Sequence, residues 1–433
     1  MIKIKSLKDF KPEEIKKLSE RRYSSQEKKV MESVLNIINE VKTRGDKALI
    51  ELTEKFDKVK LKEKQLKVSK KEIEKAVEST EETIITAIKT AAKNIEKFHK
   101  TQLPKSFKIE TTEGVEVGQI LNPLNSVGIY IPGGRFPLLS TVLMTAIPAK
   151  VAGVKSVVMC SPPRPEFSGI APPVLVAAYE AGVKEIYKVG GAQAIAAMAY
   201  GTEQVRAVDK IVGPGNIYVT TAKMAVRDDV LIDVPAGPSE VLVIADKGSN
   251  PEFIALDMIS QAEHDPLAVS VLVSPSLKVA EEVLNNINAL KTKGEISDIA
   301  IESLKNNGLI LVTDSLDQCV DFTNIFAPEH LEIMTENPEE IMEKITNAGA
   351  IFLGEYSPVP LGDFAAGTNH VLPTGGFARK YSGLTVYDYL RLMSFVKASQ
   401  QGLKNLKEAV LTLAEAEGLK GHADAVLART KEL

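Results

Sequence analysis

From about residue 127 the sequence repeats one pattern: a short apolar run, a loop rich in glycine or proline, and a helical segment. Short apolar runs bounded by turn residues predict buried strands, and the longer periodic segments between them predict helices. Such alternation constrains the fold strongly, because it implies a parallel sheet flanked by helices. The first round predicts strands at 127–131, 154–159, 185–189 and 210–212, and helices at 141–152, 173–181 and from about 218.

A second round of the same pattern begins at residue 240. It predicts strands at 240–245, 269–273, 309–312 and 350–353, with helices at 251–264 and 277–290 and a short helix before the last strand. The sequence therefore predicts two α/β units in tandem.

Helical segments flank these two units. The first hundred residues are rich in Lys and Glu, and Ser69 with Glu72 and Ser79 with Glu82 each fit a capping box. Glu113-Gly114 predicts a hairpin turn between alternating segments. After residue 381 the helical period returns, with a stripe of Leu403, Leu406, Val410 and Leu413. This tail can pack on its own chain or lie across a partner, and periodicity does not decide between them.

Composition excludes several classes of protein. A chain of 433 residues is long enough for two or more domains. Its net charge of −4 argues against a surface for nucleic acid or anionic membranes. No apolar run is long enough to span a membrane, the N-terminus lacks a signal core, and the two cysteines form no disulfide framework. We therefore expect a cytoplasmic protein.

Four of the five histidines follow residue 260, and each stands in a short polar motif. Gln261 and His264 are three residues apart near the end of a predicted helix, so they share a face. Asp363 lies in a Pro-rich loop after a strand, and His422 lies in the tail. Imidazoles and a carboxylate with an open position suit catalytic zinc, although glutamine is an unusual zinc ligand.

The remaining histidine, His99, follows Phe98 at the end of a predicted helix, and we expect it to be a surface residue without a catalytic role.

Glu329 and His330 place a carboxylate and an imidazole side by side after a proline. Such a pair can activate water and accept a proton. The alternative is a helix start, with Glu329 near the first turn and His330 incidental. Cys160 ends a predicted strand without a base beside it, which favours an inert buried thiol over a nucleophile. Cys319 is less informative still.

Three glycine-rich loops lie at the carboxyl ends of predicted strands, where open α/β sheets bind ligands. They are Pro132-Gly133-Gly134, Gly190-Gly191-Ala192-Gln193 and Gly213-Pro214-Gly215-Asn216. None has the dinucleotide fingerprint of alternating glycines, and each alone is compatible with a tight turn. Together they favour a nucleotide or another phosphate-bearing ligand, because the last loop runs into a helix start whose free amides attract phosphate.

The motifs closely resemble those of the histidinol dehydrogenase family over essentially the whole chain. The resemblance rests on the segments 127–134, 189–197, 213–216, 235–240, 260–264, 327–331 and 367–374. It implies one zinc ion per subunit bound by Gln261, His264, Asp363 and His422. It implies Glu329 and His330 as the acid–base pair, and NAD contacts from Tyr130, Gln193 and Asn216. Ser239, His370 and Glu417 would lie around the substrate, L-histidinol, together with His330 and the metal ligands.

The resemblance also implies an architecture of two tandem, incomplete Rossmann-like parallel-sheet domains with helical N- and C-terminal extensions in an intertwined homodimer. We expect an N-terminal extension at 1–23 and a first α/β domain at 24–126 plus 241–380, carrying most of the metal and catalytic residues. An NAD-binding α/β domain at 127–240 and a helical dimerisation segment at 381–433 complete the expectation. Glu417 and His422 would then act in the partner's site, so that the dimer shares its active sites.

The implied reaction is the zinc-dependent four-electron oxidation of L-histidinol to L-histidine through the aldehyde with two NAD⁺, the last step of histidine biosynthesis. One alternative is a zinc hydrolase of a small amide or ester, in which Glu329 activates water and the glycine loops are only structural. Another is a zinc-stabilised binding protein without catalysis.

Overall fold

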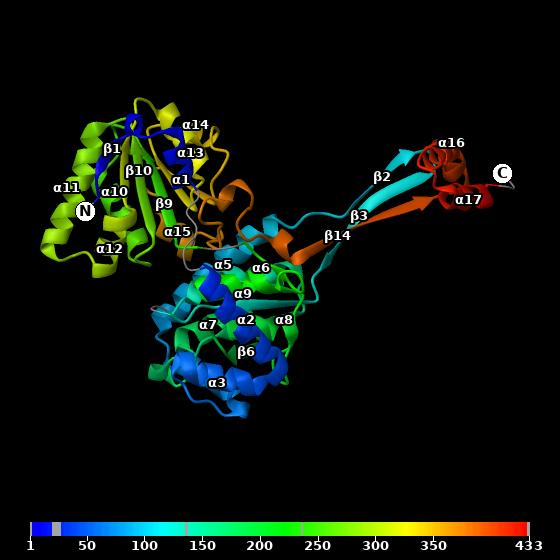
Figure 1. The fold of residues 1–433 in the computed structure, drawn as a ribbon, viewed down its shortest axis with the longest axis horizontal. Coiled ribbons are helices and arrows are strands. Elements are labelled where there is room, and N and C mark those ends of the chain that lie inside the picture. The colour runs from blue at the N-terminus through cyan, green and yellow to red at the C-terminus, as the bar shows by residue number, and fades with distance from the viewer. Residues whose placement is uncertain (1, 20–26, 135–136, 235–236, 431–433) are drawn as a thin grey trace.

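The computed structural model describes residues 2–19, 27–134, 137–234 and 237–430. Figure 1 shows an α/β body on a six-stranded sheet, a second α/β body on a five-stranded sheet, and a long arm that ends in two helices. The predicted alternation of strands and helices is confirmed in both bodies. The predicted boundary between residues 23 and 24 lies outside the described residues.

The five-stranded sheet has the order β6-β5-β4-β7-β8, and all neighbouring strands are parallel. The direction of strand addition reverses between β4 and β7, which is the switch point where open parallel sheets bind ligands. The strands are β4 Ser126–Tyr130, β5 Ser156–Ser161, β6 Glu185–Lys188, β7 Lys210–Val212 and β8 Leu231–Ile232.

Helices cover both faces of this sheet. On one face lie α4 Lys70–Ser79, α5 Glu82–Thr101, α6 Leu139–Ala152 and α7 Pro172–Ala181. On the other face lie α2 Glu27–Arg44, α3 Asp46–Asp57, α8 Gly191–Tyr200 and α9 Ile217–Val226. The N-terminal helices thus share two cores with the predicted NAD-binding domain, whereas we had assigned residues 24–126 to the domain of residues 241–380. An amphipathic pattern shows which helix face is buried but not what covers it.

The six-stranded sheet has the order β1-β11-β10-β9-β12-β13 and is also parallel throughout. Its strands are β1 Ile4–Ser6, β9 Glu240–Ala245, β10 Val269–Ser274, β11 Leu309–Val312, β12 His330–Met334 and β13 Ala350–Leu353. The helices α10 Pro251–Ala262, α11 Leu277–Lys293 and α12 Asp298–Asn307 cover one face. The other face is covered by α1 Pro12–Leu18, α13 Leu316–Phe326 and α14 Pro338–Met342, and the short α15 Val359–Phe364 follows β13.

The N-terminal residues that the structure describes, 2–19, pack on the six-stranded sheet. Strand β1 pairs in parallel with β11, with Ile4 opposite Ile310. The partly buried side chains of Ile15 and Leu18 pack on the core of the same sheet. The sequence did not reveal this pairing within the predicted extension 1–23, because a three-residue strand is too short to show a period of its own.

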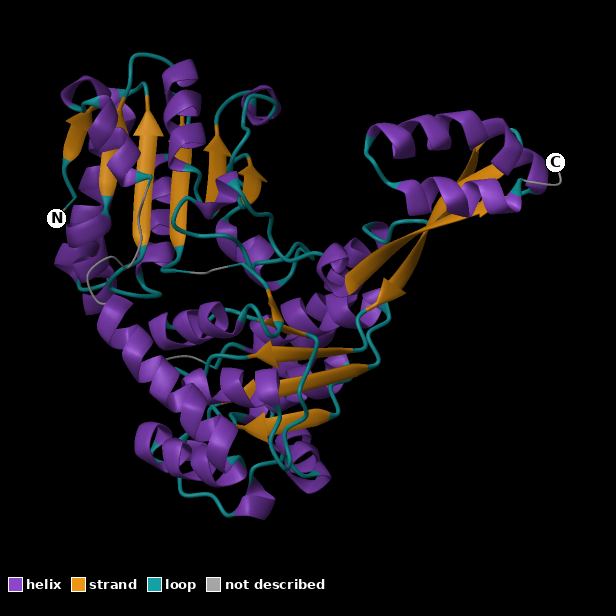
Figure 2. Cartoon of the chain, turned by 45° about the vertical axis from the view of Figure 1, so that its right-hand side comes forward, coloured by secondary structure: helices purple, strands orange, loops and turns teal. Residues whose placement is uncertain are grey.

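The arm consists of an antiparallel sheet with the order β14-β3-β2, capped by two helices (Figures 1 and 2). Its elements are β2 Phe107–Thr112, β3 Val115–Pro123, β14 Leu390–Ala398, α16 Gln400–Ala416 and α17 Lys420–Arg429. The predicted hairpin turn at Glu113-Gly114 is confirmed. The C-terminal segment is only partly helical, because residues 390–398 pair with the whole of β3.

Two local predictions differ from the structure. The capping box of Ser69 and Glu72 is confirmed, but α5 is capped at Glu81, and Ser79 ends the preceding helix. His99 is fully buried, and its Nδ1 lies 2.8 Å from the carbonyl oxygen of Ile95. The prediction of a surface position for His99 is therefore wrong, because His99 lies on the same buried face of α5 as Ile88 and Ile95.

Short 3₁₀ helices cover Leu7–Asp9, Glu63–Gln65, Pro165–Phe167, Phe377–Arg379 and Val386–Tyr389. Within the described part of the chain, none of the helices combines the length and apolar character needed to cross a membrane.

Candidate active site

The predicted acid–base pair lies at the first residue of β12 and the residue before it. Strand β12 runs between β9 and β13, with His330 opposite Val241 on one side and Ala350 on the other. The side chains of Glu329 and His330 are both buried. The alternative of a helix start is therefore wrong, since His330 begins a strand in the interior of a parallel sheet.

The backbone of Glu240, the first residue of β9, orients both side chains. Its N–H donates to Glu329 Oε2 at 2.7 Å, and its carbonyl oxygen lies 2.9 Å from His330 Nδ1. A carbonyl can only accept, so Nδ1 carries the hydrogen. When His330 is neutral, its Nε2 therefore presents a lone pair, and within the described residues Nε2 has no hydrogen-bond partner.

Asp363 completes a cluster of charge around His330. Its Oδ1 lies 3.4 Å from His330 Nε2, and Glu329 Oε2 lies 3.6 Å from His330 Nδ1. Burial lowers the pKa of His330, but the carboxylates of Glu329 and Asp363 outweigh it and raise the pKa overall. Burial also raises the pKa of Glu329, which the neighbouring imidazole only partly offsets. Two groups with perturbed pKa values that face each other are typical of an acid–base site.

Helix α15 and the loop behind it position Asp363 and His370. Asp363 is on the last turn of this six-residue helix, not in the loop that we predicted. Nδ1 of His370 lies 2.9 Å from the carbonyl oxygen of Asp363, so it carries the hydrogen, and Nε2 lies 3.3 Å from Thr141 Oγ1. Because Thr141 belongs to α6, the predicted substrate histidine lies where the two α/β bodies meet.

The predicted metal ligands of α10 lie at its C-terminal end. Gln261 is buried in the last turn, whereas His264 lies just beyond the helix and is exposed. The end of the helix is therefore where Pro266 predicts it. Burial raises the pKa of the Asp363 carboxyl, but the nearby histidines, His264 among them, lower it overall. His264 is therefore near enough to Asp363 for its charge to affect the pKa of that carboxyl.

The remaining predicted ligand does not reach this site in the same chain. His422 and Glu417 are both exposed, in α17 and just after α16, at the far tip of the arm (Figure 1). Among the described residues no three His, Cys, Asp or Glu side chains converge to hold a metal. The predicted ligands of one chain are an imidazole, a carboxylate and an amide, and the first two are donors that zinc prefers in proteins.

Ser239, the last predicted substrate residue, precedes β9 and is half-buried. Its carbonyl oxygen accepts a hydrogen bond from Val269 N–H at 3.0 Å, which ties the segment before β9 to β10. Because Glu240 follows directly, Ser239 lies next to the residue that orients Glu329 and His330.

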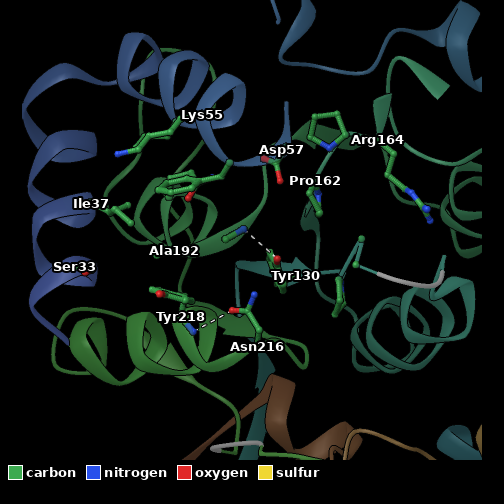
Figure 3. Close-up of a pocket in the computed structure, with 18 of the residues that line it drawn as sticks. Ser33, Ile37, Lys55, Asp57, Tyr130, Pro162, Arg164, Ala192, Asn216 and Tyr218 are labelled. Atoms are coloured by element: carbon green, nitrogen blue, oxygen red, sulfur yellow. Dashed lines mark hydrogen bonds between the residues drawn. The ribbon is translucent and has the colours of Figure 1, made fainter. Parts of the chain in front are cut away.

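The three predicted NAD-contacting residues line one cavity of about 930 Å³ in the five-stranded body. Figure 3 shows Ile37 on α2 at one side, Asn216 and Tyr218 below, and Asp57 beside Pro162 above Tyr130. A volume of this size is typical of cofactor sites. The cavity lies at the carboxyl ends of β4 to β7, across the switch point of the sheet.

Hydrogen bonds hold the side chains of Tyr130 and Asn216 in place. The Tyr130 hydroxyl accepts a hydrogen bond from Gly191 N–H at 3.1 Å (Figure 3). Asn216 caps α9, because its Oδ1 accepts hydrogen bonds from Tyr218 and Val219 N–H at 3.0 and 3.2 Å. Gln193 is buried, and its Nε2 has no partner among the described residues, so a donor is left for a ligand. The three predicted loops therefore follow β4, β6 and β7 as expected.

Cys160 is fully buried on β5, and burial raises the pKa of its thiol well above the usual range. Burial also raises the pKa of Cys319, to about 11. The prediction of inert thiols agrees with both environments, since the thiolate is the nucleophilic form.

Three residues of these sites were missed from the sequence. Glu240 orients the acid–base pair through its backbone, Thr141 contacts His370, and Asp57 lines the cavity. Thr141 and Asp57 lie in predicted helical segments, and nothing in the sequence around them indicates a functional role. Only Glu240 carried a signal, as a carboxylate that opens an otherwise apolar strand.

Comparison with known proteins gives a consistent result. The family model described as histidinol dehydrogenase matches residues 20–430. A histidinol dehydrogenase of Methanosarcina mazei is 51% identical over 98% of this chain and 97% of its own length. A histidinol dehydrogenase of Methanocaldococcus jannaschii is 49% identical over 99% of both chains. The crystal structure of histidinol dehydrogenase from Elizabethkingia anophelis matches with a TM-score of 0.93 and 42% identity, covering 100% of this chain and 98% of that one.

Proposed function

Because the chain belongs to the histidinol dehydrogenase family, and is thus an NAD-dependent oxidoreductase of histidine biosynthesis, we propose how its own residues perform the reaction. The substrate alcohol is oxidised to the aldehyde and then to the acid, with one hydride passing to NAD⁺ in each step. The observation that carries this proposal is the pair Glu329 and His330, oriented by one backbone segment at the start of β9.

In the first step His330 acts as the base. Its Nδ1–H donates to the Glu240 carbonyl, so the free lone pair is on Nε2. Nε2 accepts the hydroxyl proton of the substrate while the carbinol carbon transfers a hydride to NAD⁺, which leaves the aldehyde and NADH. The neighbouring carboxylates stabilise the imidazolium that forms, as their effect on the pKa of His330 shows.

In the second step Glu329 acts on water. One of its oxygens, Oε2, accepts the Glu240 N–H, and the other remains for a proton from water. As the water oxygen adds to the aldehyde carbon, Glu329 takes one water proton and His330 returns the proton of the first step to the aldehyde oxygen, which gives the hydrate. His330 is then neutral again and accepts a hydroxyl proton of the hydrate as the second hydride leaves to a second NAD⁺. The products are the carboxylic acid and a second NADH. Cys160 takes no part, because it is buried in the other body.

We assign the zinc ligands to Gln261, His264 and Asp363 of one chain and His422 of a second copy. The metal supplies Lewis acidity that orients the substrate and has no redox role. Ser239, His370 and Glu417 line the substrate around these ligands, and the exposed His264 marks the open side of the site.

Tyr130, Gln193 and Asn216 hold NAD in the cavity of the five-stranded body. The unpartnered Nε2 of Gln193 donates to the cofactor, and the Asn216 amide N–H₂ is free for it because only Oδ1 caps α9. These assignments follow the shared cavity and the position of its loops at the switch point.

The arm supports a homodimer that shares its active sites. It exposes large apolar side chains, among them Val396, Leu413 and Ile109, which are 74%, 64% and 54% exposed. Exposed apolar surface of this kind marks a protein–protein contact. Glu417 and His422 lie at the tip of this arm, away from the site of their own chain. If a second copy covers the arm, the two residues can reach the active site of that copy.

The test is the stoichiometry of the reaction with L-histidinol and NAD⁺. We expect two NADH per histidinol, loss of activity with a chelator, and recovery with zinc. One NADH per substrate would indicate a simple alcohol dehydrogenase, and hydrolysis of an amide or ester without NADH would indicate the zinc hydrolase instead.

A further inference from the structure

A buried ion pair contacts the loop that carries Asn216. Lys223 on α9 and Asp233, the residue after β8, pair through Nζ and Oδ1, and their side chains are only 3% and 1% exposed. Neither residue lines the cavity, and neither enters the reaction as described above. A pair of charges in such a place needs a reason, because removal of both from water is costly.

Both backbone polar groups of Gly213 bond to this pair. Its N–H donates to Asp233 Oδ2 at 2.6 Å, and its carbonyl oxygen accepts from Lys223 Nζ at 2.9 Å. Gly213 is the first residue after β7, so its N–H and carbonyl have left the sheet and would otherwise be buried without partners. The side chains of Lys223 and Asp233 thus provide the hydrogen-bond partners that a neighbouring strand provides within the sheet.

Gly213 has little freedom of its own in this position. Its φ is +120°, a conformation that favours glycine, and a Cβ would collide with the carbonyl oxygen of Tyr130. The turn therefore passes directly against the end of β4, where Tyr130 faces the cavity. A small movement of Gly213 changes the separation between the loops that carry Tyr130 and Asn216.

The pair also joins three elements around the loop. Lys223 is seven residues beyond Asn216 on the same helix, and Asp233 follows the neighbouring strand β8. Asn216 is fixed to the start of that helix by its cap. The hydrogen bonds of Gly213 to Lys223 and Asp233 thus connect the loop, the helix and the end of the strand.

From this arrangement we propose that Lys223 and Asp233 are positioning residues that hold the Gly213–Asn216 loop in the conformation that binds NAD⁺. The proposal rests on the proposed function of the cavity and adds to it the residues that shape its loop. Loss of the pair leaves the Gly213 turn without its two side-chain hydrogen bonds, so the loop is less ordered in the free protein. Part of the binding free energy of NAD⁺ is then spent on ordering the loop. The affinity for NAD⁺ falls, whereas the metal and acid–base residues of the other body are unaffected.

The experiment uses the full-length, zinc-loaded protein and the variants Lys223→Met and Asp233→Asn. The asparagine of Asp233→Asn keeps an acceptor for Gly213 N–H. The double variant Lys223→Met/Asp233→Asn leaves neither charge of the pair buried without its partner, so we expect it to fold even if a single variant does not. Lys210→Met is the control, because Lys210 is a buried cation on the same β7 that pairs with Asp388 at 2.9 Å and makes no hydrogen bond to Gly213. Thermal unfolding of each variant shows how much stability is lost.

We expect the Kd and KM for NAD⁺ to rise about tenfold or more in Lys223→Met and in the double variant, as loss of a buried hydrogen bond implies. The kcat at saturating NAD⁺ and the KM for histidinol should stay within about twofold, and the Lys210→Met control should keep its NAD⁺ affinity. An NAD⁺ Kd within twofold of the parent in the folded double variant would overturn the proposal, as would equal losses for NAD⁺ and histidinol. Since NAD⁺ binding is measured directly, a parent that bound NAD⁺ but made no NADH would refute the function and not this assignment.

Discussion

Replacement of Glu329 by glutamine separates the two halves of the reaction. Glu329 Oε2 accepts the Glu240 N–H at 2.7 Å, and an amide oxygen can accept the same hydrogen bond. Glutamine also has nearly the same volume, so the buried packing around residue 329 is kept. What is lost is the negative charge and the capacity to take a proton from water.

The size of the effect follows from these roles. General base catalysis contributes a factor of roughly 10² to 10⁴, or about 3 to 5 kcal/mol of activation free energy. This loss should fall on oxidation of the aldehyde, which needs an activated water. Oxidation of the alcohol uses His330 as the base and should fall by less than about tenfold, because only a neighbouring charge has changed.

The pH dependence of the first half should change as well. Burial lowers the pKa of His330, and the Glu329 carboxylate is the largest of the effects that raise it. Without that carboxylate the pKa of His330 falls, so the neutral base is present at a lower pH. The alkaline rise of the alcohol-oxidation rate should therefore move to lower pH in Glu329→Gln.

The assay measures NADH from each half separately. L-histidinol with one equivalent of NAD⁺ in a single turnover reports the alcohol step, and L-histidinal with NAD⁺ reports the aldehyde step. The parent protein and a melting curve of the variant serve as controls. Equal losses in both halves, with the fold intact, would refute the assignment of Glu329 to water activation.

Three further predictions follow from the same structure. Mixing His422→Asn with Glu329→Gln under conditions that exchange subunits should restore about a quarter of the parent activity, because half of the dimers are mixed and each has one intact site; no recovery would place His422 in the site of its own chain. Cys160→Ala should retain the aldehyde-oxidation kcat within about twofold in a folded variant, since burial keeps the thiol protonated; a loss above a hundredfold confined to that step would contradict a non-covalent route. Burial raises the pKa of Asp57 to about 6, above its unfolded value, so the ionised form destabilises the fold and stability is lost as pH rises from about 4 through 6. Asp57→Asn should therefore gain about 1 kcal/mol over the parent at pH 8, after allowance for partial exposure, and nothing at pH 4, by denaturant unfolding without NAD⁺; equal stability at both pH values would argue against this burial effect.

The parallel sheets could be predicted from sequence because each buried strand stands alone in the chain. Strand β9, for example, is buried at all six positions and lies between turn residues. A buried strand of a parallel sheet reads as a continuous apolar run, so its bounds are visible without its neighbours. The arm lacks this signal: in β14 most positions are exposed, and its pairing with β3 depends on residues about 270 positions away.

The packing of whole segments could not be predicted in the same way. Helix α5 shows its buried stripe in Ile88 and Ile95, but that stripe fits any apolar surface. Only the structure shows that it packs on α6 and α7 beside the five-stranded sheet. The error at His99 has the same origin, because a buried imidazole needs partners such as Ile95 and Asn369, and sequence spacing did not reveal the second.

The orientation of the acid–base pair depends on strand order, which spacing along the chain does not contain. Glu240 and His330 are 90 residues apart, and two strands with their helices lie between them in sequence. They meet because β12 pairs with β9, whereas β11 pairs with β10 on the side away from β9. The register then places His330 opposite Val241, so that the N–H and the carbonyl of Glu240 both reach across to residues 329 and 330. A dipeptide of Glu and His is common enough to be incidental. We propose an acid–base role for this one because the neighbouring strand fixes the tautomer of His330 and holds one oxygen of Glu329.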